Sequence, residues 1–125
     1  MMTVDTLPIS PERSGCPIAT TLDIAGDKWT LIIVRDMLTG KKRFKEFLQS
    51  PEGITTNILA DRLGRLVAAG LAEKTLYQEH PARYEYSLTP PGENLISVLQ
   101  AISKWANTFV PDTWTPPAWF MERQP

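Results

Sequence analysis

The chain has 125 residues, of which 42% are hydrophobic, so it can build one modest core and one domain. No apolar run approaches the roughly 20 residues that span a bilayer, and the amino terminus lacks a basic stretch followed by an apolar one. We therefore expect a soluble, cytoplasmic protein with no membrane partner. A single cysteine, Cys16, excludes an internal disulfide, and one histidine, His80, leaves too few ligands for a zinc site. The sequence indicates no metal and no cofactor.

Charge is unevenly distributed along the chain. The net charge is −1, yet residues 28–83 contain ten basic and six acidic side chains, and the remainder is acidic. A basic segment can face a polyanion such as nucleic acid, but such an excess can also be ordinary solvated surface. Charge alone does not separate these two interpretations.

Both ends of the chain are predicted to lack regular structure. Residues 1–15 mix prolines, serines and a glycine with polar residues, which favours a flexible arm. Residues 111–125 contain four prolines, which cannot continue a helix. The aromatic residues Trp114, Trp119 and Phe120 indicate that this tail packs on the body. We expect the folded domain over residues 16–110.

Three helices are predicted in the first half of the domain. Pro17 opens the first, because proline suits the first helical position, and Gly26 ends it. Asp27 is a suitable cap for the second, which carries an apolar stripe on one face. The third is short, covers residues 43–48 and is followed by a Pro-Glu-Gly turn.

A longer helix and a hairpin follow. Thr55 is a suitable amino-terminal cap for the helix, which runs to Gly70 with leucines on one face and small or polar residues on the other. Residues 72–77 and 84–89 are short segments of β-favouring residues, and residues 78–83 join them. This pattern predicts a β-hairpin.

The last predicted helix begins at Pro90 and Pro91 and continues for about 18 residues. Its apolar side chains cover more than half of its circumference. A stripe of that width is more than one contact within a small domain buries, so we expect it to form a subunit interface.

Two short helices across a tight turn, followed at once by a hairpin, give the element order of a winged helix-turn-helix. The predicted fold is mainly α-helical with one small hairpin. In this arrangement the second helix enters the major groove of DNA, where Asn57 can pair with an adenine edge, and the hairpin, or wing, reaches neighbouring backbone. The candidate DNA-binding residues are Arg43, Lys45, Thr55, Thr56, Asn57, Ala60, Asp61, Arg62, Arg65, His80 and Arg83.

Three of the residues on the longer helix have competing interpretations. Arg62 can reach a phosphate, but it can equally pair with Glu46 or Asp36 inside the fold. Asp61 is unfavourable beside phosphates, and Gly64 costs about 1 kcal/mol in a helix interior relative to alanine. Either these two face a cytosine amine and a close contact, or the reading face is assigned one residue off.

Seven segments in order resemble the HxlR-type regulators, relatives of the MarR-type winged-helix repressors. Between Cys16 and about Val110 they read CPI, LDIAGDKWT, RFKEF, GIT, LADRL, AGL and RYEYSLTPPG. The resemblance implies a recognition helix that begins at Thr55, a palindromic operator, and usually repression. Asn57 and Gly64 depart from the family pattern on the reading face, so the operator sequence does not carry over.

The resemblance also implies a homodimer built from the first and last helices. That dimer would bury the apolar stripe of the last helix, which the residue pattern alone assigns to a subunit interface. The expected interface residues are Ile18, Leu22, Leu95, Leu99, Ile102, Trp105 and Phe109.

Cys16 stands immediately before Pro17, where free backbone N–H groups and the helix dipole favour a thiolate. Some HxlR-type regulators sense oxidants, quinones or aldehydes through a cysteine at this position, and the resemblance implies that role for Cys16. With one thiol, the available products are an intersubunit disulfide, a mixed disulfide with a small thiol, or an adduct. The alternative is a small residue that only packs at the dimer seam.

Other classes of function fit the sequence less well. An enzyme would have only Cys16 and His80 as nucleophile and base, with no third group to orient the histidine, so we expect no catalysis. The acidic whole-chain balance is compatible with a winged helix that binds protein instead of DNA. A small-molecule effector at the dimer seam, roofed by Trp114 and Trp119, is the alternative to thiol chemistry.

Overall fold

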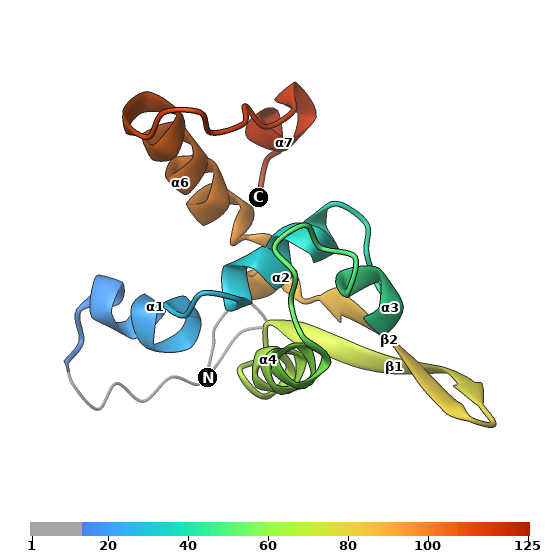
Figure 1. Cartoon of the computed structure of the whole chain (residues 1–125). Helices are drawn as coiled ribbons and strands as arrows, with labels where there is room; N and C mark the ends of the chain where they lie inside the picture. Colours follow the sequence, from blue (N-terminus) through green and yellow to red (C-terminus); the bar gives the residue numbers. More distant parts are fainter. Residues whose placement is uncertain (1–13) are drawn as a thin grey trace.

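The computed structural model describes residues 14–125 (Figure 1). The predicted flexible arm therefore lies almost entirely outside the described residues. Helix α1 spans Pro17–Ala25 and helix α2 spans Thr30–Leu38. The carboxylate of Asp27 accepts hydrogen bonds from the backbone N–H groups of Trp29 and Thr30, at 2.9 and 3.1 Å. As its position predicts, Asp27 satisfies donors at the start of α2 that have no partner inside the helix.

The hydrophobic core gathers around α2, which packs against helices α4 (Thr56–Ala68) and α6 (Ile96–Phe109). Each large apolar side chain that is fully buried stabilises the fold by about 1.5–3 kcal/mol. Because α4 turns its leucines toward this core, its other face is left to solvent. The core residues are Ile33, Val34, Leu38, Phe47, Ile54, Leu59, Leu63, Leu66, Leu71, Ala72, Ile96, Leu99 and Phe120.

Helices α3 (Phe44–Phe47) and α4 form the predicted helix-turn-helix. Phe47 at the end of α3 and Ile54 just before α4 are both buried, which anchors the turn to the core at both sides. Between them Gly53 has a φ of 74°, a backbone conformation that glycine adopts without strain. The sequence therefore correctly places both helices and the turn.

The wing is longer, and its loop shorter, than predicted. Strands β1 (Ala72–Glu79) and β2 (Ala82–Leu88) pair antiparallel, and only His80 and Pro81 connect them, through a cis peptide bond. The predicted loop over residues 78–83 is therefore wrong, because its outer residues continue the backbone pairing. Most side chains of the wing are exposed, so polar residues extend these strands as readily as apolar ones.

The predicted final helix is two helices. Helix α5 covers Pro90–Glu93, with the side chain of Thr89 accepting from the N–H of Gly92, and α6 begins after a turn. A Cβ at Gly92 would lie 2.1 Å from the carbonyl oxygen of Leu71, so glycine is required for α5 to approach the base of the wing. This close packing anchors α5 to the base of the wing.

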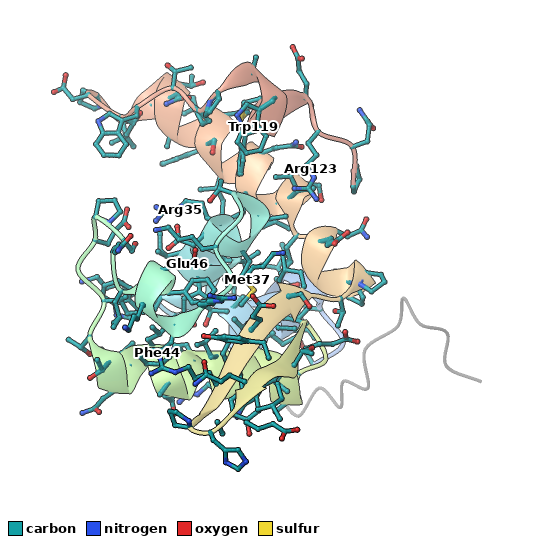
Figure 2. All side chains as sticks on the ribbon, turned by 90° about the vertical axis from the view of Figure 1, so that its right-hand side faces the viewer. Arg35, Met37, Phe44, Glu46, Trp119 and Arg123 are labelled. Carbon is teal, nitrogen blue, oxygen red and sulfur yellow. The ribbon has the colours of Figure 1, made fainter. Side chains whose placement is uncertain are left out.

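The prediction that the tail lacks regular structure is wrong. Helix α7 spans Ala118–Glu122, and Figure 1 shows it beside α6. Its Phe120 is buried in the core, and the amide of Gln100 donates to the carbonyls of Phe120 and Arg123, both at 2.9 Å. Arg123 in turn donates to the carbonyl of Leu38 at the end of α2 (Figure 2). Proline ends a helix, but Pro117 directly precedes one, where its missing N–H costs nothing.

Candidate nucleic-acid interface

Helix α4 presents one polar face to solvent. The hydroxyl of Thr55 caps its amino end by accepting from the N–H of Ile58 at 3.4 Å. The predicted division of the helix into two faces is correct: its leucines are buried and its small and polar residues are exposed. The exposed residues are Thr56, Asn57, Ala60, Asp61, Gly64, Arg65 and Ala68.

A cluster of charges fixes the turn before α4. Arg35 of α2 donates two hydrogen bonds of 2.8 Å to the carboxylate of Glu52 and two more to Asp36. Ser50 accepts from Arg35 and donates to Glu52 at 2.6 Å. The bond from Arg35, assisted by that from Ser50, lowers the pKa of Glu52 to about 2. The cluster thereby ties the turn to α2 and orients the first turn of α4.

The start of α3 is held to the wing. The carboxylate of Glu46 accepts the backbone N–H groups of Lys42 and Arg43, at 2.9 and 2.8 Å, and these bonds lower the pKa of Glu46. The carbonyl of Lys42 accepts the N–H of Tyr86 in β2 at 2.8 Å. Residue 43 pairs with residue 85 as an isolated bridge, so the backbone before α3 lies against β2.

Arg43, predicted as a DNA contact, also joins α3 to both strands of the wing. Its Nε donates to Glu85 of β2 at 3.1 Å, and its guanidinium lies 4.0 Å from the ring centroid of Tyr77 in β1. Such cation–π contacts contribute about 0.5–1 kcal/mol at exposed sites. The side chain of Arg43 is half exposed, so it can reach a phosphate while it holds the wing.

A hollow of about 490 Å³ lies between α3 and the wing, beside these contacts. It brings together Arg43, Lys45 and Arg83, three of the predicted DNA contacts, from both sides of the hollow. Lysine and arginine side chains beside tyrosine hydroxyls suit the oxygens of a phosphate backbone. The lining residues are Arg43, Phe44, Lys45, Glu46, Tyr77, Ala82, Arg83, Tyr84 and Tyr86.

The two arginines of α4 pair with acids. Arg62 Nε donates to Asp27 at 2.8 Å and its Nη1 donates to Asp61, while Arg65 Nε lies 2.9 Å from Asp61. The predicted pairing of Arg62 with Glu46 or Asp36 is wrong, because both carboxylates accept hydrogen bonds from other groups. Two arginines offset the charge of Asp61, so this acid is compatible with a DNA-facing surface.

Sequence reasoning missed three supporting residues of this site. Asp27 pairs with Arg62 across 35 positions of the chain, and Arg43 meets Glu85 across 42. Tyr77 lies at a register shift in β1, between paired residues 76 and 78. Helical spacing reveals partners only within a turn, so the one signal for Asp27 and Glu85 is their place in the segments that resemble the family, and Tyr77 lies outside those segments.

A second surface, called here the apolar surface, is formed by the exposed residues of α1 and α6. Its members are Ile18, Leu22, Ile102, Trp105 and Phe109, with 49–70% of each residue exposed. Of the other residues expected at a dimer interface, Leu95 is half-buried against the core and Leu99 is buried in the core of its own chain, so Leu99 offers almost no area to a partner.

Cys16 is exposed immediately before α1, and His80 lies at the tip of the wing on β1 and β2. The two candidates for a catalytic pair therefore belong to elements that stand at opposite ends of the molecule (Figure 1). Within residues 14–125, no group of three or more His, Cys, Asp or Glu side chains could hold a metal ion. No helix in the same range is long and apolar enough to cross a membrane.

A helix-turn-helix with an exposed polar second helix, followed by a wing, defines the class of winged-helix DNA-binding transcriptional regulators. The family model described as HxlR-like helix-turn-helix matches residues 24–113. The chain therefore belongs to the HxlR-like helix-turn-helix family, a family of transcriptional regulators and not of enzymes.

Relatives in sequence and in structure agree with this assignment. The HTH-type transcriptional regulator YybR of Bacillus subtilis (strain 168) is 37% identical over 100 residues, which are 80% of each chain. The crystal structure of PA1607 superposes with a TM-score of 0.72 at 39% identity, covering 82% of this chain and 72% of that one. The redox regulator HypR in its reduced form gives a TM-score of 0.68 at 35% identity, covering 74% and 92%.

Proposed function

We propose that this regulator binds a palindromic DNA operator as a homodimer and represses transcription. The observation that carries the proposal is the exposed polar face of α4, flanked by the basic hollow between α3 and the wing. In this arrangement α4 reads base edges in the major groove, with Asn57 placed to pair with an adenine. Lys45, Arg83 and His80 contact phosphates on either side.

The apolar surface supports the homodimer. Monomeric proteins seldom leave this many large apolar side chains exposed. The rings of Trp105 and Phe109 are in tilted contact, with centroids 5.6 Å apart, while both remain exposed, so this pair is preformed for burial. A twofold pairing through α1 and α6 gives each dimer two copies of α4, which matches the symmetry of a palindrome.

The DNA-binding proposal is tested with two substitutions of different kind. Duplexes are selected from a randomised pool by the wild-type protein, and affinity is measured by fluorescence anisotropy over a range of salt. Asn57→Ala should relax the preference for one base by about 1–3 kcal/mol. Arg83→Ala should weaken binding to all sequences alike. It should also reduce the slope of log affinity against log salt concentration by about one. Salt-insensitive binding, or no retention of duplex DNA at low salt, would favour a protein-binding winged helix.

We infer, as a second part of the function, that Cys16 makes DNA binding sensitive to oxidants. HypR is described as a redox regulator, and the Cys16 thiol is exposed beside the apolar surface. Two Cys16 thiols from paired chains lose two electrons and two protons to an oxidant such as diamide, forming one intersubunit disulfide. Diamide should release DNA from the wild type and leave Cys16→Ser bound.

If both proteins release DNA equally, a non-covalent effector at the dimer seam becomes the better hypothesis. A roof formed by Trp114 and Trp119 over such a pocket stays a prediction. Both indoles are more than half exposed, so they are accessible to a ligand or a partner.

A further inference from the structure

We propose that Asp27 and Arg62 are positioning residues that set the orientation of the recognition helix, so that Arg62 acts on operator affinity through Asp27 and not as a phosphate contact. The proposal rests on the DNA-binding function proposed above. It concerns how α4 is held, which neither the family assignment nor the relatives specify.

The guanidinium of Arg62 is paired with two acids of its own chain. Its Nε donates to Asp27 at 2.8 Å, and its Nη1 donates to Asp61 on the same helix. Its side chain is 19% exposed, whereas that of Arg65, one turn further along α4, is 65% exposed. Arg65 can therefore reach a phosphate without losing a partly buried ion pair, and Arg62 cannot.

Asp27 is the junction of three helices. It lies between the end of α1 and the start of α2, and it accepts the N–H groups of Trp29 and Thr30, the hydroxyl of Thr30, and Arg62 of α4. Partial burial disfavours the charged carboxylate, but these four hydrogen bonds outweigh it and hold the pKa of Asp27 well below its ordinary value. One permanently charged carboxylate thus begins α2 and holds α4.

The hydrogen bond between Arg62 and Asp27 restrains the orientation of α4, which the apolar contacts of the core do not. The core face of α4 consists of leucines, and contacts between apolar side chains are not directional. A charge-assisted hydrogen bond from Arg62 to a fixed carboxylate prevents α4 from rotating or sliding on that face. Since Asn57 and Thr56 must meet base edges within a few tenths of an ångström, a small rotation of α4 costs base recognition before it costs stability.

Asp27→Asn separates the two roles of Arg62 because they predict effects of opposite sign. If Arg62 contacts phosphate, removing the acid frees it and lowers the local negative charge, so binding tightens. If the pair positions α4, binding to a duplex selected by the wild type weakens, by about tenfold. Asparagine keeps a side-chain oxygen that caps α2 about as well as aspartate does. An unrelated duplex of equal length, held only by phosphate contacts, should change by less than about twofold.

Arg62→Gln and the double variant complete the cycle. Positioning predicts that Asp27→Asn adds little to Arg62→Gln and that the salt dependence stays at the wild-type value. The matched control is Arg65→Gln on the same helix. It should weaken binding to both duplexes and reduce the slope of log affinity against log salt concentration by about one. Urea unfolding of each variant verifies that it is folded at the temperature of the binding assay.

The proposal is overturned if Asp27→Asn binds the selected duplex as tightly as the wild type or more tightly. It is also overturned if Arg62→Gln reduces the slope of log affinity against log salt concentration by about one. If Asp27→Asn does not fold, Arg62→Lys tests the same point, because it keeps the charge and loses the planar fork. Positioning then predicts loss of preference for the selected duplex, and a phosphate contact predicts that the preference is kept. Failure of the wild type to bind any duplex would instead remove the DNA-binding proposal itself.

Discussion

The surface formed by α3, α4 and the wing and the apolar surface of α1 and α6 are built in opposite ways. On the first, arginines such as Arg43 and Arg62 are paired with acids of the same chain, so contacts within the chain orient these side chains. On the second, formed by α1 and α6, large side chains such as Trp105 and Ile18 are mostly exposed. Contacts within one chain therefore hold the surface of α3, α4 and the wing in place, and we propose that a second chain covers the apolar surface.

The largest expected effect comes from placing a charge on the apolar surface. Ile102→Asp should yield a monomer by analytical ultracentrifugation, because a carboxylate cannot be buried unpaired. Loss of the second reading helix should lower operator affinity by about 100-fold or more. Lys104→Asp, at another exposed position on α6, is the control and should remain dimeric. A dimer that persists in Ile102→Asp would show that α6 does not form the interface.

The next effect is on stability and concerns α5, the helix between the wing and α6, where it packs on the base of the wing. Gly92→Ala should lower the free energy of unfolding by roughly 1–3 kcal/mol, because its Cβ would overlap the carbonyl oxygen of Leu71. Gly64→Ala is the contrasting variant: a Cβ at Gly64 has no atom within 4 Å, so it should stabilise α4 by about 1 kcal/mol. Urea unfolding measures both. Equal effects of the two substitutions would contradict the close packing of α5.

A smaller effect tests whether the wing is held by its own acids. Glu85→Gln removes a negative charge near the DNA, which by charge alone should tighten binding. If Glu85 instead fixes Arg43 against the wing, affinity for the selected duplex should fall by about two- to fivefold. Anisotropy titration at two salt concentrations distinguishes these signs. Tighter binding would mean that Arg43 needs no partner in β2.

The smallest effect is the pH dependence of the turn before α4. The folded state lowers the pKa of Glu52 from 4.5 to about 2, so its bond to Arg35 contributes fully above pH 4.5 and is lost as the pH falls toward 2. Because the pair is partly exposed, the contribution should be about 1 kcal/mol or less. Between pH 4.5 and 2, Glu52→Gln should lose less stability than the wild type in urea unfolding. Parallel losses would show that the pair contributes nothing.

The sequence alone predicts the elements of this fold well where periodicity and capping residues coincide. In α4, the leucine spacing and Thr55 indicate both the start of the helix and its exposed face. The prediction fails where tertiary contacts decide: α7 forms because Phe120 has a place in the core, and the strands of the wing continue through polar residues because both backbones find partners.

The candidate site was predictable in its positions but not in its pairings. Asn57, Arg65 and Lys45 are exposed, as helical spacing indicates. The partners of Arg43 and Arg62 come from segments far along the chain, and no local rule identifies them. Leu99 shows the converse limit, since an apolar stripe does not reveal which of its members the chain itself buries.

The anchored tail has a practical consequence for anyone who shortens this protein. The region shared with the family ends at residue 113, yet Phe120 fills space beside α2 and α6, and Gln100 has its hydrogen-bond acceptors beyond that limit. A chain that ended at residue 113 would lack Phe120 and leave a cavity in the core. The half-buried amide of Gln100 would also lose its hydrogen-bond acceptors. The smallest intact unit of this regulator therefore extends beyond residues 24–113, the segment that the family model matches.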